Sequence, residues 1–483
     1  MSGDFVSYEE KDAAFFAERR LRRHAGLGSL WALGVGAVIS GDFFGWNFGL
    51  DVGGFGGLLI ATALATVLYA GLCASIAELA AALPHAGGAY SFGRSAFGPW
   101  GGFVAGLAAN IEYVLTPAVI VVGIGGYLGA VFGTPAAAAP LWWLGAYALF
   151  VGLNVRGVEL TFRVAIGTTL VALAVLVVFC AAALPEFSWE MALSVPPDVG
   201  QSRFLPHGWL GVLWCLPFAM WFFLAVEELP LAAEEARDPV RDLPRALGLS
   251  LATLVVAAFC VLFANAGVAP GAVGVGVSDE PLFLGFRATF GDAAGARVLS
   301  LVAVAGLIAS FHSIIYAYGR NIFALSRAGY FPHWLSRTHG ENQTPHVALI
   351  VGAVIGFFVA LLIEYSDAVF GDVPVGAVLL NMAVFGALIS YVMQLAAFLA
   401  LRRSSPKLER PHRSVLGVSG AWVALVLAGV ALLCLFLNPE YSVGVWGCVV
   451  WYALGIGYFA LVGRHRLVLA PEEEAARDAR DGG

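Results

Sequence analysis

The sequence predicts an all-α membrane protein with about 12 transmembrane helices. Of its 483 residues, 60% are hydrophobic and 12% are charged, a more apolar composition than that of soluble domains. The apolar runs are close to twenty residues long and do not alternate with period two. They are therefore predicted to be helices that cross about 30 Å of hydrocarbon, and not the strands of a barrel.

Twelve spans are predicted along the chain. They lie near residues 28–50, 55–83, 96–131, 140–154, 160–184, 208–229, 246–270, 296–324, 346–364, 374–400, 415–437 and 443–463. The outer loops near 185–207 and 271–295 are expected to carry short helices or ordered turns. The chain thus divides into an N-terminal segment (1–27), a transporter domain (28–463) and a tail (464–483), whose polar composition predicts disorder.

The positions of Lys and Arg predict the orientation. With the N-terminus inside, 23 of the 26 basic residues fall in inner segments, and only Arg203, Arg287 and Arg297 fall outside. Inner loops of membrane proteins carry such an excess. Both termini are therefore predicted to be cytoplasmic, in a multi-pass protein of the cell (inner) membrane. No cleavable signal peptide is visible, so the first span is expected to act as the insertion signal.

The cysteines give no indication of a metal or disulfide site. All six lie inside apolar segments and lack metal-ligand spacing: Cys73, Cys180, Cys215, Cys260, Cys434 and Cys448. They are interpreted as small buried side chains. We expect no cofactor, no metal and no nucleic-acid partner.

A carboxylate stands in the middle of the first span. Asp42 lies between Gly41 and Gly45, and such a charge costs roughly 2.5–3.5 kcal/mol on insertion scales. The sixth span carries Glu227 and Glu228 equally deep. The two spans start five helices apart, an odd number, so the two halves of the chain would be inverted in the membrane. Paired interrupted helices in inverted halves indicate the central site of a transporter.

Three sequence blocks resemble the amino acid–polyamine–organocation permeases. They are PHAGGAYSF with AFGPW at 84–100, WFFLAVE with EEARDP and LPRA at 221–246, and ALSRAGYFP at 324–332. Their order and spacing follow the family over nearly the whole chain. The resemblance implies a five-plus-five inverted repeat (28–184 and 208–400) with broken helices one and six, plus two peripheral helices (415–463).

The resemblance also implies a substrate pocket at the two breaks, completed by helices three, eight and ten. The matching positions are Ser40, Gly41, Asp42 and Phe43 in helix one, Glu112, Thr116 and Pro117 in helix three, and Trp221, Ala225 and Glu227 in helix six.

Two positions depart from the usual pattern of amino acid permeases. Where those proteins have a Gly-Ser-Gly run that binds a carboxylate, this chain has Ser40, Gly41 and Asp42. An acid at this point resembles the ethanolamine permease subfamily, and Glu112 fits that subfamily too. Ala225 stands where many relatives have glycine, so helix six is expected to unwind less or one residue away.

Each of these residues also has a structural interpretation. Asp42 is either a ligand for an ammonium or an acid tied to backbone amides of the break. Glu112 either faces the substrate or pairs within the bundle. Trp221 is either a gate or core packing, and His312 is either a titrating group or a satisfied core histidine. Glu227 and Glu228 point about 100° apart on a helix, and Glu227 is favoured as the one that faces the pathway.

The sequence predicts the ion that drives transport less sharply than it predicts the fold. Some relatives place a lysine in the fifth span where others bind sodium, but Lys11 and Lys407 both lie in inner segments. Glu112 and Glu227 are the predicted proton carriers, with His312 as a further candidate. Sodium coupling, uniport and exchange remain open.

The leading hypothesis is a secondary transporter that imports a small primary amine, ethanolamine first, by proton symport with alternating access. The alternative is an amino acid permease of the same fold. A membrane-embedded hydrolase is disfavoured because the sequence has no His-Glu-x-x-His and no activated Ser or Cys motif. A nutrient sensor is disfavoured because both terminal segments are short.

Overall fold

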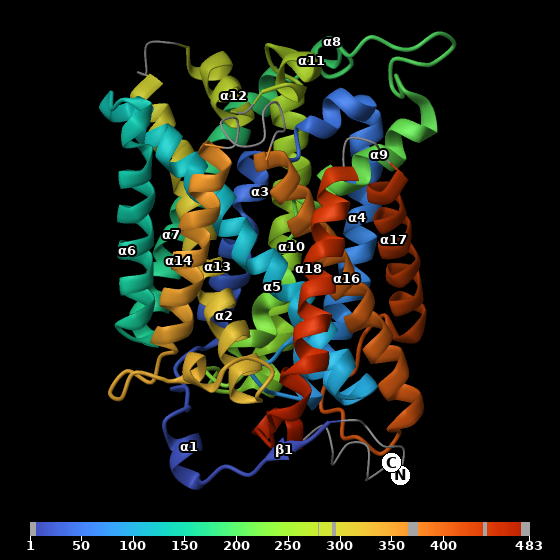
Figure 1. Cartoon of the computed structure of the whole chain (residues 1–483). Helices are drawn as coiled ribbons and strands as arrows, with labels where there is room; N and C mark the ends of the chain where they lie inside the picture. The colour runs from blue at the N-terminus through green and yellow to red at the C-terminus, as the bar shows by residue number, and fades with distance from the viewer. Residues whose placement is uncertain (1–5, 279, 292–295, 366–374, 438–441, 475–483) are drawn as a thin grey trace.

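A computed structural model describes residues 6–278, 280–291, 296–365, 375–437 and 442–474. The helices run side by side as a bundle, with the shorter elements at its two ends (Figure 1). The long or paired helices that form the bundle are α2 (Leu27–Val38) with α3 (Ser40–Phe43), α4 (Phe48–Ala82), α5 (Ala89–Phe132), α6 (Ala139–Val155), α7 (Val158–Ala183), α9 (Gly208–Met220) with the 3₁₀ helix η3 (Val226–Ala232), α10 (Pro239–Ala266), α13 (Ala296–Arg327), α14 (His346–Glu364), α16 (Val375–Ser404), α17 (Gly417–Leu437) and α18 (Ser442–Leu461).

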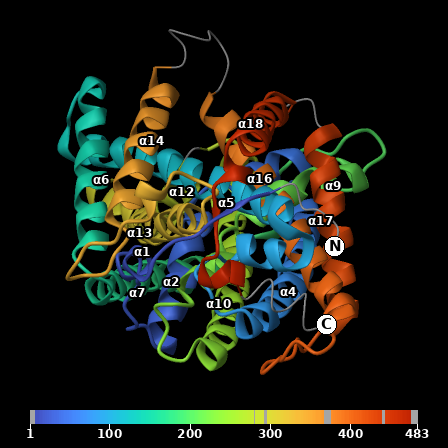
Figure 2. The same ribbon diagram turned by 60° about the horizontal axis from the view of Figure 1, so that its bottom comes forward.

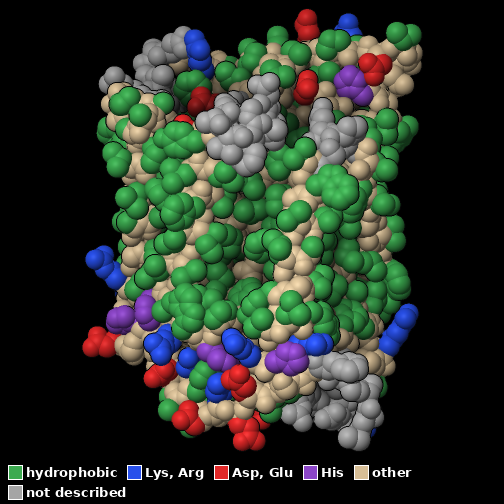
Figure 3. Space-filling model, viewed as in Figure 1, with side chains coloured by type: hydrophobic (Ala, Val, Ile, Leu, Met, Phe, Trp, Pro, Cys, Tyr) green, Lys and Arg blue, Asp and Glu red, His purple; other side chains and the backbone are tan. Residues whose placement is uncertain are grey.

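These helices confirm the predicted fold class, an all-α membrane protein with twelve spans, of which the first and the sixth are interrupted. Within the described residues, nine helices are long and apolar enough to cross a membrane, and two shorter apolar ones, Leu27–Phe43 and Gly208–Met220, belong to the interrupted spans. Apolar side chains cover the middle of the bundle, and charged ones gather toward its ends (Figure 3). The division into residue ranges for the two repeats stays a prediction.

Two of the long elements, α4 and α5, each consist of two helices that meet at a glycine. α4 contains both the end of span one and all of span two, because Gly54 has a φ of 70° and turns the chain between them. α5 likewise begins with a short helix that ends at Gly98, whose φ is 79°. Residues with a side chain rarely adopt such positive φ angles, whereas glycine adopts them without a steric penalty. Pro99 then starts the long third span, at a position where proline's missing N–H costs no helical hydrogen bond.

Short elements lie in the loops. They are β1 (Tyr8–Glu9), α1 (Ala13–Ala17), η1 (Ala136–Ala138), η2 (Leu184–Glu186), α8 (Trp189–Ala192), α11 (Gly271–Gly276), α12 (Pro281–Phe290), η5 (His333–Ser336), η7 (Gly463–His465) and β2 (Leu467–Val468). The loops near 185–207 and 271–291 therefore carry the predicted short helices, while 292–295 lie outside the described residues.

The described elements nearest the two termini, β1, α1 and β2, lie at one end of the bundle, which we call the terminal end (Figure 1) and which Figure 2 brings forward. There β1 and β2 pair in parallel, with Tyr8 opposite Leu467 and Glu9 opposite Val468. The prediction of a disordered tail is wrong for its first half. Residues 471–474 form a helical turn in which Glu472 and Glu473 are fully buried, and 475–483 lie outside the described residues.

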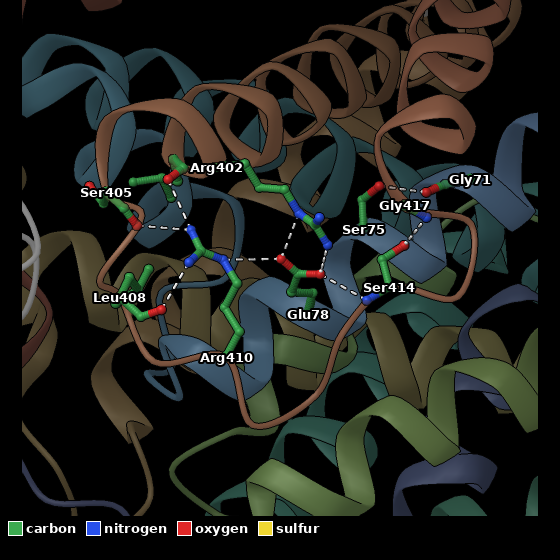
Figure 4. A network of polar contacts seen from close by, with 10 residues as sticks. Gly71, Ser75, Glu78, Arg402, Ser405, Leu408, Arg410, Ser414 and Gly417 are labelled. Atoms are coloured by element: carbon green, nitrogen blue, oxygen red, sulfur yellow. Dashed lines mark hydrogen bonds and ion pairs between the residues drawn. The ribbon is translucent and has the colours of Figure 1, made fainter.

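A separate polar network joins α4 and α16 at the terminal end (Figure 4). The Glu78 carboxylate accepts hydrogen bonds from Arg402 at 3.0 and 2.5 Å and forms an ion pair with Arg410 at 3.2 Å. It also accepts from the Ser414 amide at 2.8 Å, at the approach to α17. Because one buried carboxylate holds α4, α16 and the segment that leads to α17, Glu78 has a structural role, as its position near the end of span two indicates.

Candidate functional site

The first span is interrupted just after Asp42. α3 ends at Phe43, Phe44 is extended and Gly45 has a φ of 94°. The Ser40 amide donates to the Ser310 hydroxyl at 2.9 Å, and that hydroxyl donates to the Gly36 carbonyl at 2.9 Å. α13, which carries Ser310, thus supplies a side chain that satisfies backbone groups ahead of the break.

Asp42 itself is fully buried, and neither carboxyl oxygen has a hydrogen-bond partner in the described part of the chain. The side chain therefore does not hold backbone amides of the break, which is the contact that a purely structural acid would make. A buried polar group without a partner costs free energy, so such groups are concentrated where a ligand or water completes them.

The sixth span is interrupted at Ala225. α9 ends at Met220, and the chain turns through 221–225 before η3 begins. Ala225 has a φ of 82° and a ψ of 1°, a left-handed conformation that costs a residue with a Cβ roughly 1–2 kcal/mol. The break passes through Ala225 itself, so the expectation that it would lie one residue away is wrong, and the strain is borne at Ala225. The alternative, that alanine reduces the extent of unwinding, stays a prediction.

The two breaks touch each other. A Cβ on Gly41 would lie 1.9 Å from the Trp221 carbonyl oxygen, so only glycine allows this approach. A Cβ on Gly45 would lie 3.4 Å from the Trp221 ring, and the rings of Trp46 and Phe222 stack at 5.2 Å. Trp221 is 6% exposed. The indole therefore packs against the broken segment of span one, the place where a gate would act.

Three glutamates form a second acidic group. The Glu227 carboxylate accepts from Tyr113 at 3.4 Å and from Tyr391 at 3.1 Å. The Glu112 carboxyl is its neighbour, although no hydrogen bond of normal geometry joins the two. Glu228 is buried beside Glu227 and has no hydrogen-bond partner among the described residues. Helices three, six and ten thus contribute to one acidic cluster.

The structure does not unite the two acidic groups. No hydrogen bond or charge interaction connects Asp42 with the three glutamates in the described part of the chain. Of the other predicted residues, Phe43 packs its ring against Gly306 on α13. The Thr116 hydroxyl donates to the Glu112 carbonyl at 2.7 Å. Thr116 is thus engaged with its own helix.

His312 has a partner on each ring nitrogen. Nε2 lies 2.9 Å from the Thr161 carbonyl and Nδ1 lies 3.3 Å from the Asn154 amide nitrogen. These partners suit the neutral tautomer that donates from Nε2 and accepts at Nδ1. The ring is fully buried, and its contacts match a satisfied core histidine.

Sequence reasoning missed the tyrosines and the charges of the terminal end. Tyr113 and Tyr391 belong to no recognised sequence motif. The Tyr391 hydroxyl also lies 3.1 Å from the Tyr69 hydroxyl, within hydrogen-bond distance. Arg320, which entered the prediction only as one of the 23 basic residues of the inner segments, is fully buried and pairs with Glu235 at 2.9 Å.

Arg327 also forms buried ion pairs. It binds Glu234 at 2.5 and 2.9 Å and Glu472 of the tail at 2.8 and 3.3 Å. Burial opposes the charge of Glu234, but Arg327 outweighs it and lowers the pKa of that carboxyl to about 2. Burial raises the pKa of Glu472 to about 7, against the pull of Arg327. Glu473 meanwhile accepts from Arg94 at 2.5 Å. We call this set the terminal clasp, because it ties the tail to α5, to the end of α13 and to the segment between η3 and α10.

Comparison with known proteins identifies the family. The model of a family described as amino acid permease matches residues 26–461, which covers nearly the entire chain. The chain belongs to this amino acid permease family. It is accordingly a multi-pass membrane transporter for a small molecule.

Individual relatives agree with this assignment. The permease is 33% identical over 354 residues to an uncharacterized transporter of Rhizobium meliloti, covering 71% of this chain and 73% of the relative. It is 28% identical over 476 residues to the branched-chain amino acid permease BcaP of Bacillus subtilis, covering 95% and 97%. It is 24% identical over 439 residues to the aromatic amino acid transport protein AroP of Escherichia coli, covering 89% and 93%.

Proposed function

We propose that this permease is a secondary transporter that carries an amino acid across the membrane and holds the substrate's ammonium with the buried carboxyl of Asp42. The observation that carries the proposal is the state of that carboxyl: it is fully buried at the break of span one and has no partner among the described residues. An ammonium placed there supplies both the missing charge and the missing donors. The relatives BcaP and AroP, named for amino acid transport, support the substrate class.

The substrate carboxylate is assigned to the open backbone of the two breaks, since an ionised Asp42 repels it. Ser40, Gly41 and Phe43 form the wall from span one, and Trp221 and Ala225 form the wall from span six. Gly41 supports this assignment because it alone permits the backbone of one break to meet that of the other. Thr116 on α5 is proposed as a more distant member of the pocket.

Proton coupling is assigned to Glu112 and Glu227, with His312 as the weaker candidate. Two neighbouring carboxyls repel each other when both are charged, so such a pair is suited to bind and release one proton. The hydroxyls of Tyr113 and Tyr391 donate to Glu227 and stabilise its charged form. His312 is disfavoured because both ring nitrogens are occupied.

The membrane arrangement completes the proposal. The terminal end faces the cytoplasm of a cell whose inner membrane holds the protein, because 23 of 26 basic residues lie in segments on that side. The proposed repeats, 28–184 and 208–400, rock about the two breaks during alternating access. Residues 1–27 and 464–483 form the cytoplasmic segments, and 415–463 the peripheral pair.

Ethanolamine is the second candidate substrate. Asp42 favours it, because a carboxylate about 4 Å from a second unit charge interacts by about 4 kcal/mol at an effective dielectric of 20. An amine without a carboxylate gains this attraction with no opposing repulsion. The amino acid is placed first because the family comparison supports it, whereas ethanolamine rests on the acidic residues Asp42 and Glu112.

A substrate panel in proteoliposomes tests both candidates. Labelled alanine, leucine, phenylalanine and ethanolamine are offered with and without an inward proton gradient, and again with a sodium gradient. Saturable uptake of an amino acid that a proton gradient accelerates supports the proposal. Ethanolamine uptake without amino acid uptake would replace it with the second candidate. Acceleration by sodium alone would overturn the assignment of coupling to the glutamate pair.

A further inference from the structure

Beyond the transport site, a hollow at the terminal end carries unpaired positive charge. It has a volume of about 260 Å³ and lies where the N-terminal segment meets the turn between α6 and α7. Arg22, Arg156 and Arg163 line it, together with Glu159 and Asn342. Arg163 pairs with Glu159. Arg22 and Arg156 have no ion pair or side-chain hydrogen bond within the described residues, so the hollow keeps two uncompensated charges.

An apolar groove begins at the same arginine. Arg156 also borders a second hollow of about 560 Å³, which is lined by α6 residues such as Val151, Gly152 and Val155 and by Ile350 of α14. A third hollow of about 330 Å³ shares Val151 and Ile350 with the second and continues along the same two helices. The second and third hollows thus form an apolar groove along α6 and α14, and Arg156 stands where this groove adjoins the basic pocket.

The groove lies on the surface that the bilayer covers. α6 and α14 stand side by side at the left of the bundle (Figure 1). Along the path, Leu149 is 56% exposed, Ile350 49% and Phe358 64%. These side chains would be costly to expose to water, and hydrocarbon is the solvent that suits them.

We propose that one anionic phospholipid binds here, with its phosphate between Arg22 and Arg156 and an acyl chain in the groove between α6 and α14. Charge complementarity selects the headgroup, since basic pockets between helices at an anionic leaflet attract such lipids. The position of the groove beside the basic pocket selects a lipid over a free anion. The inference uses the proposed cytoplasmic orientation of the terminal end but is independent of the substrate.

The chain offers matched variants for a test. Arg22→Gln with Arg156→Gln removes the two unpaired charges, and Arg241→Gln with Arg245→Gln is a control of equal charge change at exposed arginines of the same end. Gly152→Phe places a ring in the groove, since a Cβ at Gly152 meets no atom within 4 Å. Gly429→Phe is its control, because Gly429 is equally open and lies in α17, which lines none of the three hollows.

Native mass spectrometry of the purified protein counts bound lipid during titration with phosphatidylglycerol or phosphatidylcholine. We expect one tight phosphatidylglycerol, weakened roughly thirtyfold in the Arg22→Gln, Arg156→Gln variant, at about 1 kcal/mol per arginine. Gly152→Phe should also weaken it, and both controls should match the wild type. Elution as a single species in size-exclusion chromatography establishes that each variant is folded.

Three results would overturn the proposal. They are equal affinity for phosphatidylcholine, unchanged phosphatidylglycerol affinity in both the arginine and the groove variants, and full competition by millimolar inorganic phosphate. The last would identify a site for the free anion only. If the arginine variant fails to fold, Gly152→Phe alone decides: unchanged phosphatidylglycerol affinity excludes an acyl chain from the groove, and weaker binding supports it.

Discussion

Replacing Asp42 with asparagine removes one charge from the candidate site with little change of shape. The carboxyl oxygens have no hydrogen-bond partner within the described residues, so the substitution breaks no protein contact there and orphans no donor. If a substrate ammonium lies about 4 Å from a charged Asp42, the lost attraction is about 4 kcal/mol at an effective dielectric of 20. At 1.4 kcal/mol per decade, binding should weaken by roughly a thousandfold.

The assay is equilibrium binding of the transported substrate to purified protein in lipid nanodiscs, accompanied by uptake into proteoliposomes. Asp51→Asn is the matched control, because it makes the same chemical change nine residues further along the chain at an exposed position. The control should bind and transport as the wild type does. The Asp42 variant should stay folded, since a buried carboxyl without a partner does not stabilise the native state.

Two outcomes would refute the reasoning. Unchanged affinity in Asp42→Asn would show that the carboxyl does not contact the substrate's charge. A loss of folding would show that Asp42 has a structural partner, such as a buried water. A selective loss of ethanolamine binding with intact amino acid binding would transfer the role of Asp42 to the second candidate substrate.

Three further predictions concern the breaks and the terminal clasp. Gly41→Ala should abolish uptake at a cost of about 1–3 kcal/mol from overpacking, because its Cβ would lie 1.9 Å from a carbonyl oxygen; Gly126→Ala, with no atom within 4 Å, should be active. Ala225→Gly should raise the melting temperature slightly, since relief of about 1–2 kcal/mol of left-handed strain outweighs a glycine entropy cost of about 0.5–1 kcal/mol; a lower melting temperature would contradict this. Burial raises the pKa of Glu472 to about 7 in the docked tail, whereas the ordinary pKa of a glutamate, expected in the free tail, is 4.5. Docking is therefore strongest below pH 4.5, where Glu472 is protonated in both states. It loses on the order of 3 kcal/mol as the pH rises to about 7, because the free tail releases this proton and the docked tail keeps it. Proteolysis of the tail should therefore be slower at pH 5 than at pH 8, and Glu472→Gln should remove the difference; an equal difference in the variant would assign it to another group.

The helices were predictable because membrane insertion is a local property. Twenty apolar residues in sequence determine a span, whatever packs against it. Within the described residues, nine helices are long and apolar enough to be spans, and two shorter apolar helices belong to the interrupted ones. The interruption of span one was predictable for a similar reason, since an acid beside glycines already disfavours a continuous helix in hydrocarbon, whereas the interruption of span six was implied by the family resemblance. The position of the break in span six was not predictable from propensity, because tertiary contacts force Ala225 into a conformation that alanine disfavours.

The structure of the tail, by contrast, could not be predicted from its composition. Pro471 and the glutamates after it have a composition typical of a disordered segment. Glu472 and Glu473 are nevertheless buried, because Arg327 at the end of α13 and Arg94 in α5 hydrogen-bond to them. Arg327 and Glu472 are 145 residues apart, so composition could not reveal their pairing.

The sequence by itself determined an all-α transporter with twelve spans, and it placed Asp42 and Glu227 at two interruptions. Hydrophobicity and helix breaking depend on neighbours along the chain, which is why the sequence alone predicts these features. Only the tertiary structure decided what the carboxyls face. Among the described residues it left Asp42 without a hydrogen-bond partner, and it gave Glu227 two tyrosines, of which Tyr391 lies 164 residues away. Whether a buried charge is satisfied depends on side chains from other helices, and their positions are set by packing across the bundle.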